Sequence, residues 1–308
     1  MSRFTSLLFA AALVLSSAAP AQSPYTSSAG QNAPMEAVRV RSVDKEGKVT
    51  EHVEQRAPQR DGYGNAQGNQ HDLAVDGAFE GQTIAVLHLY VDPTFDFSLP
   101  KAALKEKGFS VYRWVNQPPS PRELEAALAK ACQLWVISDS TRKLNEEHLA
   151  IIKRFFESGR GVYIWGDNEP YYADANALGQ ALLGVTMSGN LMGDQVVNLQ
   201  KTEGGKTVGV RRGHLLTTGL EFLYEGITIA TIQPNEVLQP LVYGSAGNYV
   251  AGFFDKGGKR AIFDGGFTRL YNKWDTAGTA RYVKNAAAWL TNAERFGDRV
   301  VSANLKKK

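Results

Sequence analysis

The sequence has little of several features that would narrow its function at once. Cys132 is the only cysteine in 308 residues, so an intrachain disulfide is excluded and a hydrophobic core must stabilise the fold. There is no HExxH motif, no CxxC motif and no phosphate-binding P-loop, and the 5 histidines show no metal-ligand spacing. Sequence motifs therefore predict neither a cofactor nor a metal ion.

A strong net charge is also missing. The formal charge is +3, from 34 Lys and Arg against 31 Asp and Glu. Nothing resembles the basic groove of a nucleic-acid-binding protein, so we expect no nucleic-acid partner. Residues 296–308, which end in Lys306-Lys307-Lys308, are interpreted as an exposed basic tail. After the N-terminal region no segment approaches eighteen uninterrupted apolar residues, so we expect no integral membrane segment in the mature chain.

The first residues have the pattern of a signal peptide. Arg3 supplies a positive charge, and residues 7–19 form a short apolar run. Ala19 and Ala21 fit an A-x-A cleavage site, which leaves Gln22 as the mature N-terminus. The alternative, a membrane anchor, is disfavoured because the run is short for a bilayer. We therefore expect a signal peptide over residues 1–21 and a periplasmic or secreted protein.

Residues 22–80 differ in composition from the rest of the chain. Ser, Gln, Asn, Gly and Pro dominate, and large apolar residues are sparse, which predicts a largely disordered arm. Within it, residues 36–56 alternate valine with polar residues around Glu46-Gly47, which favours a β-hairpin. We expect the folded domain to occupy residues 81–295.

Strand and helix patterns alternate from residue 82 onward. Short connections between them indicate βαβ units, whose crossovers place helices on both faces of a parallel sheet. The fold class is therefore α/β, a flavodoxin-like three-layer sandwich with a largely parallel central sheet and a β-rich C-terminal half. The expected strands are 83–91, 110–115, 133–138 and 162–165, and the expected helices are 99–107, one from Pro121, 146–157 and 175–183.

The second half is less regular. Residues 195–199 and 207–210 flank Gly204-Gly205 and predict a hairpin. Further strands are expected at 236–242, 249–254 and 260–263, followed by a closing helix over 277–290.

Acidic residues follow four of the expected strands. They are Asp92, Asp139, Asp167 and Asp264. If these strands are parallel, the acids share one edge of the sheet, where α/β proteins bind their ligands. Each acid taken singly is a common turn former or helix N-cap. As a group, they favour a shared site for a polar ligand.

The turn at residues 161–170 is the most informative of these strand ends. A strand runs into Gly166, Asp167 and Asn168 before a helix, which resembles the elbow that holds a Ser or Cys nucleophile in hydrolases. Neither Ser nor Cys stands there. Cys132 directly precedes an expected strand, so it lies at the end of the sheet opposite to the strand-end acids. It is expected to be a small buried residue.

Other polar residues are candidates for the same site. His214 lies in a glycine-bounded loop, as a base, a ligand or, more simply, a stabiliser of its own turn. The segment 263–289 contains Arg269 and Asp275 beside Gly265-Gly266. Arg269 either pairs with the strand-end acids or contacts a ligand, and Asp275 either binds a ligand or, like Thr276, caps the closing helix.

Two stretches resemble a known superfamily. QLWVISDSTRKLNEEHLAIIKRFFESGRGVYIWGDNEPYYADANAL and DGGFTRLYNKWDTAGTARYVKNAAAWL are similar to the class I glutamine amidotransferase-like superfamily, including its ThuA-like relatives. The resemblance covers about residues 82–292 and implies the scaffold and its crevice. The family's nucleophile would fall at Gly166 or Asp167, and its catalytic histidine would follow His214, where the chain has no histidine. Glutaminase activity is therefore not expected.

These observations lead to three hypotheses. The first is a non-catalytic, exported domain that binds a small polar ligand, a glycan or a protein partner at the carboxyl end of its sheet. The second is a hydrolase that uses carboxylates alone or a bound divalent ion. The third is an interaction protein of the cell envelope that docks an envelope protein through residues 22–80.

Overall fold

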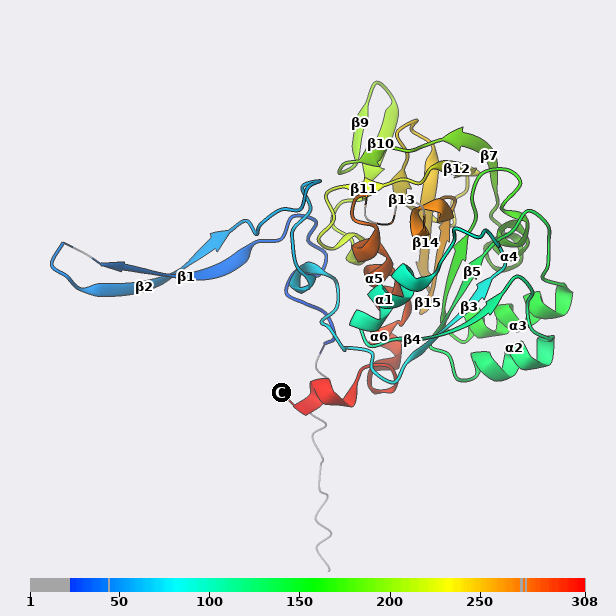
Figure 1. Cartoon of the computed structure of the whole chain (residues 1–308), viewed down its shortest axis with the longest axis horizontal. Coiled ribbons are helices and arrows are strands. Elements are labelled where there is room, and N and C mark those ends of the chain that lie inside the picture. The colour runs from blue at the N-terminus through cyan, green and yellow to red at the C-terminus, as the bar shows by residue number, and fades with distance from the viewer. Residues whose placement is uncertain (1–22, 44, 272–273, 275, 308) are drawn as a thin grey trace, which may run out of the picture.

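The computed structural model describes residues 23–43, 45–271, 274 and 276–307. Its centre is a mixed sheet of 9 strands in the order β4-β3-β5-β6-β15-β14-β13-β10-β9 (Figure 1). The first five strands in this order are parallel, and the others continue antiparallel. The predicted α/β class with a largely parallel core is confirmed. The parallel strands are β3 (Thr83–His88), β4 (Ser110–Val115), β5 (Gln133–Ile137), β6 (Gly161–Trp165) and β15 (Lys259–Asp264).

Helices cover both faces of the parallel strands. α1 (Ser98–Glu106) and α5 (Thr279–Leu290) pack together on one face, and α2 (Pro121–Leu128), α3 (Glu146–Glu157) and α4 (Ala173–Leu183) lie on the other. The short α6 (Ala293–Phe296) follows α5. Capping boxes begin α2 at Ser120 and α3 at Asn145, because each cap side chain accepts a hydrogen bond from a backbone N–H of the first turn.

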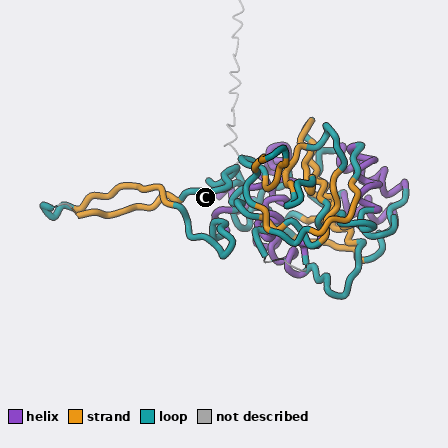
Figure 2. The backbone as a smooth tube through the Cα atoms, turned by 90° about the horizontal axis from the view of Figure 1, so that it is seen from above, coloured by secondary structure: helices purple, strands orange, loops and turns teal. Residues whose placement is uncertain are grey.

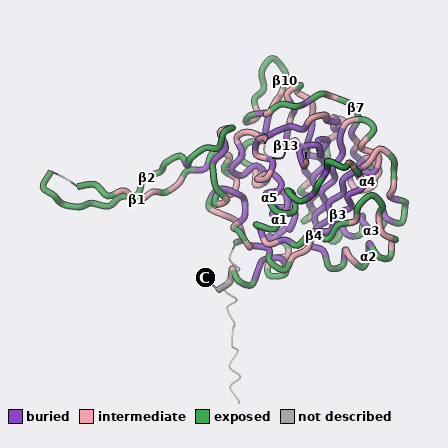
Figure 3. Tube along the Cα trace, in the orientation of Figure 1, coloured by how far each residue is buried: buried purple, intermediate pink, exposed green. Residues whose placement is uncertain are grey.

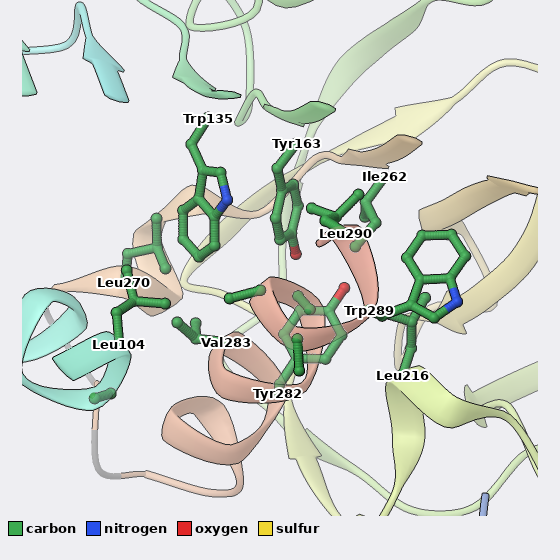
Figure 4. Packing of buried hydrophobic residues seen from close by; sticks show 14 of the residues in the cluster. Leu104, Trp135, Tyr163, Leu216, Ile262, Leu270, Tyr282, Val283, Trp289 and Leu290 are labelled. Atoms are coloured by element: carbon green, nitrogen blue, oxygen red, sulfur yellow. The ribbon is translucent and has the colours of Figure 1, made fainter. Parts of the chain in front are cut away.

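Two hydrophobic clusters hold these layers together. Alternate residues of β3 point to opposite faces, so Ile84 contacts the cluster with α1 and α5 while Ala85 contacts the cluster with α2, α3 and α4. Figure 4 shows the first cluster, in which Trp135 and Tyr163 project from the sheet toward Tyr282 of α5. The continuous apolar strands thus arise because both faces of the sheet are buried.

The antiparallel half differs in detail from its prediction. It contains β9 (Lys201–Glu203), β10 (Lys206–Val210), β13 (Gln239–Tyr243) and β14 (Tyr249–Lys256). The hairpin partner of β10 is β9 and not residues 195–199, which instead contain β8 (Val196–Val197) paired with β11 (Leu223–Tyr224). β7 (Met187–Met192) pairs with β12 (Thr228–Ile232), and the sequence patterns indicated neither strand.

A hairpin of β1 (Glu36–Val43) and β2 (Val49–Arg56) extends away from the body, as Figures 1 and 2 show. The predicted hairpin is confirmed with the expected bounds. Most of its residues are exposed (Figure 3), including Val43, Val49 and Val53. The exposed arm receives little support from the core. We therefore expect it to be only marginally stable, as isolated two-stranded hairpins are in water.

The segments on either side of the hairpin pack against the body, which differs from the expected disordered arm. Leu73 and Phe79 are fully buried, and the Phe79 ring stacks on Phe109 at 4.8 Å. The Asn32 amide donates to the backbone oxygens of Thr217 and Leu220. These segments thus pack on the body with few apolar side chains, because their polar side chains form hydrogen bonds with backbone groups of the body.

The C-terminal region likewise differs from a free tail. Val300 and Val301 are buried in the first cluster, and the Ser302 N–H donates to the Ala78 oxygen at 2.8 Å. Short 3₁₀ turns complete the fold at Asn69–His71, Leu215–Thr217, Phe267–Leu270, Gly297–Arg299 and Ala303–Lys307. Within the described part of the chain, no helix is long and apolar enough to cross a bilayer. The expected signal peptide lies outside the described residues.

Candidate functional site

The parallel strands bring several predicted site residues to one edge of the sheet. Residue pairing places Asp264 at the end of β15 beside Trp165 at the end of β6. Asp139 follows β5, and Asp92 follows β3 after a further three residues. The expectation that the strands carrying these acids run parallel is confirmed. What each carboxylate does there differs from residue to residue.

Asp264 is the acceptor at the centre of a fully buried network. Its Oδ2 accepts hydrogen bonds from Arg269 at 2.9 Å, Tyr282 at 2.9 Å and Tyr163 at 3.2 Å, and its Oδ1 accepts from the Gly266 N–H at 3.1 Å. Burial raises the pKa of Asp264, and the positive charge of Arg269 opposes that rise. Neither side chain of the ion pair is exposed to solvent. This network therefore joins β15, β6 and α5 inside the protein.

Arg269 links this network to the neighbouring loop. One terminal nitrogen donates to the Asp264 carboxylate, and the other donates to the backbone carbonyl oxygen of Glu225 at 2.8 Å. The guanidinium also lies over the rings of Trp165 and Tyr282, at 5.8 and 5.5 Å from their centres. Of the two roles that the sequence left open for Arg269, its contacts match pairing with a strand-end acid.

Asp167 is buried at the corner after β6. Its Oδ1 accepts from the Asn168 N–H at 2.7 Å and its Oδ2 from the Thr268 N–H at 2.9 Å. Burial raises the pKa of Asp167 to about 7, although these backbone donors and Arg269 favour the charged form. The Asn168 side chain is half-buried and accepts a hydrogen bond from the Thr228 hydroxyl at 2.8 Å. The corner thus contains a carboxyl group that titrates near neutrality.

The geometry of this corner differs from a nucleophile elbow. Gly166 and Asp167 have no positive φ, and α4 begins only at Ala173. A Cβ on Gly166 would lie 2.5 Å from the Met187 sulfur, so a Ser or Cys side chain there would require Met187 to move. The packing around Gly166 therefore favours glycine at this strand end.

Asp139 is tied to a lysine that the sequence analysis missed. Lys143 Nζ lies 2.7 Å from Asp139 Oδ2, and it donates to the Leu89 oxygen and the Asn116 amide oxygen, both at 2.9 Å. Lys143 therefore bridges the ends of β3, β4 and β5. Both residues lie in the loop between β5 and α3, outside any helix, so no periodic pattern in the sequence indicated this pair.

Asp174 is a second buried carboxyl group that the sequence did not reveal. Its Oδ1 accepts from the Lys143 and Leu144 N–H groups at 2.9 and 2.8 Å, and burial raises its pKa. The Ser138 hydroxyl accepts from the Asp174 and Ala175 N–H groups at the start of α4. These contacts fasten α4 to the end of β5.

The remaining predicted site residues lie apart from this group. Asp92 Oδ1 accepts from the Thr94 N–H at 2.7 Å, and its Thr94 contacts lower its pKa, as in an Asx turn. His214 accepts from the Leu216 N–H at 3.2 Å, and its ring lies 4.2 Å from that of Phe253. Burial lowers the pKa of His214 to about 4, so the ring is neutral and stabilises its own turn. Asp275 lies outside the described residues.

The closing helix begins at a different place from the predicted one. Gly278 is the N-cap of α5, with φ of 62°, and the helix therefore begins without a side-chain cap. Thr276 therefore does not cap the helix, and glycine fits because its backbone adopts this left-handed conformation without strain.

Aromatic side chains form a surface at the same end of the sheet. Tyr90 follows β3, Tyr171 follows the β6 corner and Tyr271 follows β15, and all three are half-buried. The Tyr90 ring lies 5.3 Å from Tyr171 and 6.3 Å from Tyr271. Beneath them, Phe95 packs 4.3 Å from Tyr271 and Phe267 packs 4.9 Å from Tyr90. We call Tyr90, Tyr171 and Tyr271 the tyrosine surface. A tyrosine shortly after each strand end was the sequence signal for it.

Cavities lie elsewhere in the molecule. Four are described: between β4 and α2, beside the start of α5, between α2, α3 and α6, and along the β9–β10 hairpin. None of these four is lined by a predicted site residue. No group of three or more His, Cys, Asp or Glu residues suited to a metal ion occurs within the described residues.

Comparisons with known proteins give limited information. No protein-family model matches the chain, and no curated protein matches it. Similar solved structures include a protein described as ThuA-like from Parabacteroides merdae ATCC 43184, with 14% identity and a TM-score of 0.43, covering 69% of this chain and 90% of that chain. Another is a GMP synthase subunit-like protein from Thermoplasma acidophilum, with 10% identity and a TM-score of 0.42, covering 70% of this chain and 96% of that chain.

A third similar structure belongs to a longer protein. It is an exo-beta-1,4-mannosidase from Opitutaceae bacterium strain TAV5, with 12% identity and a TM-score of 0.37, covering 68% of this chain and 36% of that chain. At such identities and TM-scores, none of the three supports a transfer of activity, ligand or residue roles.

Proposed function

We propose that the protein is an exported, non-catalytic domain of the flavodoxin-like, amidotransferase-like class that binds a glycan at the carboxyl end of its parallel sheet. The observation that carries this proposal is the tyrosine surface, with Asn168 beside the β6 corner. Aromatic rings offer flat apolar faces to the C–H groups of a sugar ring, while the Asn168 amide and the tyrosine hydroxyl groups match its hydroxyls. A small polar ligand with an apolar face would use the same contacts.

The state of the acids supports binding over catalysis. Asp264 is paired with Arg269, Asp139 with Lys143, and Asp92 with the Thr94 turn. A general acid or base must reach the reacting atoms, whereas these carboxylates already serve internal donors. The β6 corner has no Ser or Cys in place of Gly166 or Asp167.

The test is direct titration of the mature protein with three soluble β-1,4-linked hexasaccharides. One is built of glucose, one of N-acetylglucosamine and one of mannose. We expect heat of binding from at least one of them by calorimetry. Tyr171→Ala should weaken binding about three- to tenfold, the range for one aromatic contact. Tyr112→Ala is the matched control, because Tyr112 is 54% exposed on the edge strand β4, away from the tyrosine surface. Equal binding in both variants, or binding of no hexasaccharide, would refute the proposal.

Export is part of the proposal and has its own test. The sequence of residues 1–21 supports it through the basic residue, apolar run and A-x-A site. Expression of the full chain should yield a protein that begins at Gln22 in the periplasm or medium, as determined by intact mass. A retained Met1 in the soluble cell fraction would contradict export.

The hairpin arm supports an additional role in docking an envelope protein. Its exposed valines alternate with charged residues on a segment that the core does not support. Deleting residues 36–56 should abolish capture of an envelope partner in cross-linking experiments while leaving hexasaccharide binding intact. Unchanged capture would exclude this role.

A carboxylate-dependent hydrolase is the second candidate. It is favoured by Asp167, whose pKa is raised to about 7 by burial, near the value that suits a general acid or base. In that case one of the hexasaccharides is cleaved, and Asp167→Ala abolishes turnover. Turnover that requires an added divalent ion would identify the metal-dependent form of this hydrolase.

A further inference from the structure

A groove lies at the opposite end of the parallel sheet from the tyrosine surface. It has a volume of about 490 Å³ and runs between α2, α3 and α6. Ser158 and Arg160 line it just before β6 begins, which places it at the amino ends of the strands. Its volume lies in the range of small-molecule sites. We call it the arginine groove, and it plays no part in the function proposed above.

Positive charge in the arginine groove exceeds negative charge. Arg154, Arg160 and Arg299 line it together with a single acid, Glu125. Arg154 is paired with Glu125 at 2.7 Å. Within the described residues, neither Arg160 nor Arg299 has a carboxylate at ion-pair distance. Two guanidinium groups are thus left to share one groove.

These two arginines repel one another. The pKa of Arg160 is lowered by burial and by the positive charge of Arg299. Arginine remains charged at all ordinary pH values, so proton loss cannot relieve this repulsion. A bound anion can, because planar guanidinium groups form paired, charge-assisted hydrogen bonds with phosphate or carboxylate oxygens.

Apart from Ser158, the rest of the groove is apolar. Leu128, Ile151, Phe155 and Phe296 line it. The Arg160 guanidinium lies 4.2 Å from the centre of the Phe296 ring, which holds its charge at the boundary between the apolar wall and solvent. A ligand that fills the groove therefore carries both an anionic group and an apolar group.

We propose that the arginine groove binds a phosphate monoester with an apolar substituent, its phosphate contacting Arg160 and Arg299 and its substituent packing on Phe155 and Phe296. A phosphate dianion neutralises both arginines at once, which a single carboxylate does not. The phosphate belongs either to a soluble metabolite or to a lipid headgroup, and the experiment separates these two sources.

The first arm uses calorimetry with phenyl phosphate and inorganic phosphate on the full mature protein. We expect phenyl phosphate to bind more tightly than inorganic phosphate, because the phenyl ring adds contacts with the apolar wall. Binding should weaken from pH 7.5 to pH 5, since the phosphate loses its second charge near pH 6 while the arginines keep theirs. No heat from phenyl phosphate at pH 7.5 overturns the proposal.

Variants then locate the binding. Arg160→Gln and Arg299→Gln should each weaken phenyl phosphate binding about tenfold or more, the loss expected for a charge-assisted hydrogen bond. Arg122→Gln is the matched control, because it removes the same charge from the surface of α2 outside the groove. Arg299 is exposed, so its replacement leaves the core intact. Equal affinity in Arg299→Gln and Arg122→Gln overturns the proposal.

The second arm uses vesicles of phosphatidylcholine with and without phosphatidic acid. Sedimentation that depends on phosphatidic acid and is lost in the Arg160→Gln, Arg299→Gln double variant assigns the site to a lipid headgroup. Phenyl phosphate binding without sedimentation assigns it to a soluble phosphate ester. Sedimentation unchanged in the double variant, with no binding of phenyl phosphate, overturns the groove as the site.

Discussion

The two ends of the parallel sheet use charge in opposite ways. At the carboxyl end, Asp264 and Arg269 form a buried pair and Lys143 neutralises Asp139. At the amino end, Arg160 and Arg299 face one groove without an acid at ion-pair distance among the described residues. A buried charge that loses its partner is costly to the fold, whereas like charges left together in a groove mark a candidate ligand site. The acids that attract attention in the sequence are therefore largely structural.

The largest expected effect comes from breaking the buried pair. Arg269→Ala leaves Asp264 buried without its positive partner, which should lower the free energy of unfolding by about 3–5 kcal/mol. Arg299→Gln should change the free energy of unfolding by no more than about 0.5 kcal/mol, because Arg299 is exposed and its replacement removes the repulsion with Arg160. Urea denaturation measures both. Similar values for the two variants would remove the contrast between the ends of the sheet.

The next effect is a pH dependence from Asp167. Its pKa rises to about 7 in the folded protein, so between about pH 4 and 7 the folded state holds a proton that the unfolded state has released. Stability from this group therefore falls as pH rises through that window, by about 1.4 kcal/mol per pH unit, and levels off above it.

Asp167→Asn separates this contribution from other titrating groups. The variant loses a hydrogen-bond acceptor and is destabilised overall, but it has no proton to release at this position. Wild-type stability minus variant stability, from urea curves at pH 5, 6 and 7, should decrease with pH. A constant difference would show that burial does not raise this pKa.

A smaller effect is expected at Asp139. Asp139→Ala leaves Lys143 with two neutral acceptors, the Leu89 oxygen and the Asn116 amide, so about 1–2 kcal/mol of stability should be lost. Chemical denaturation checks this value, and Arg122→Gln gives the baseline for a surface change. A loss equal to that baseline would mean that Asp139 is free to meet a ligand.

The smallest effect is expected at Asp92. This residue stabilises its own turn through Thr94 at the protein surface, so Asp92→Ala should affect unfolding less than Asp139→Ala does. Because its pKa is lowered, its contribution is present near neutral pH and is lost as pH falls through the folded value. Melting temperatures at pH 7 and pH 3 test this, and a larger loss at pH 3 would contradict it.

The sequence predicted the parallel half of the fold well because local signals and tertiary packing agree there. Continuous apolar strands, the capping boxes at Ser120 and Asn145, and short connections all indicate βαβ units. Residues 195–203 were harder to predict, since β8 has two residues and β9 has three. Strands this short are too brief to show an alternating pattern, and β8 pairs with β11, which lies far from it in the sequence.

The convergence of the strand-end acids was predicted from the sequence, but the contacts that each acid makes were not. Parallel strands fix where their ends meet, so Asp139, Asp167 and Asp264 came to the same edge. Whether a carboxylate meets solvent or an internal donor depends on side chains such as Tyr282 and Lys143, whose directions only the folded structure shows. The arginine groove was missed for the same reason, because α2, α3 and α6 bring its residues together from separate parts of the chain.

The most direct test of the central claim is amide chemical-shift mapping of the isotope-labelled mature protein with the hexasaccharide that binds most tightly in the calorimetric titrations. We expect shifts grouped on the residues that follow β3, β6 and β15, around Tyr90, Tyr171 and Tyr271, with none at the arginine groove. Shifts confined to the hairpin arm or to the arginine groove would contradict a glycan site at the carboxyl end of the sheet.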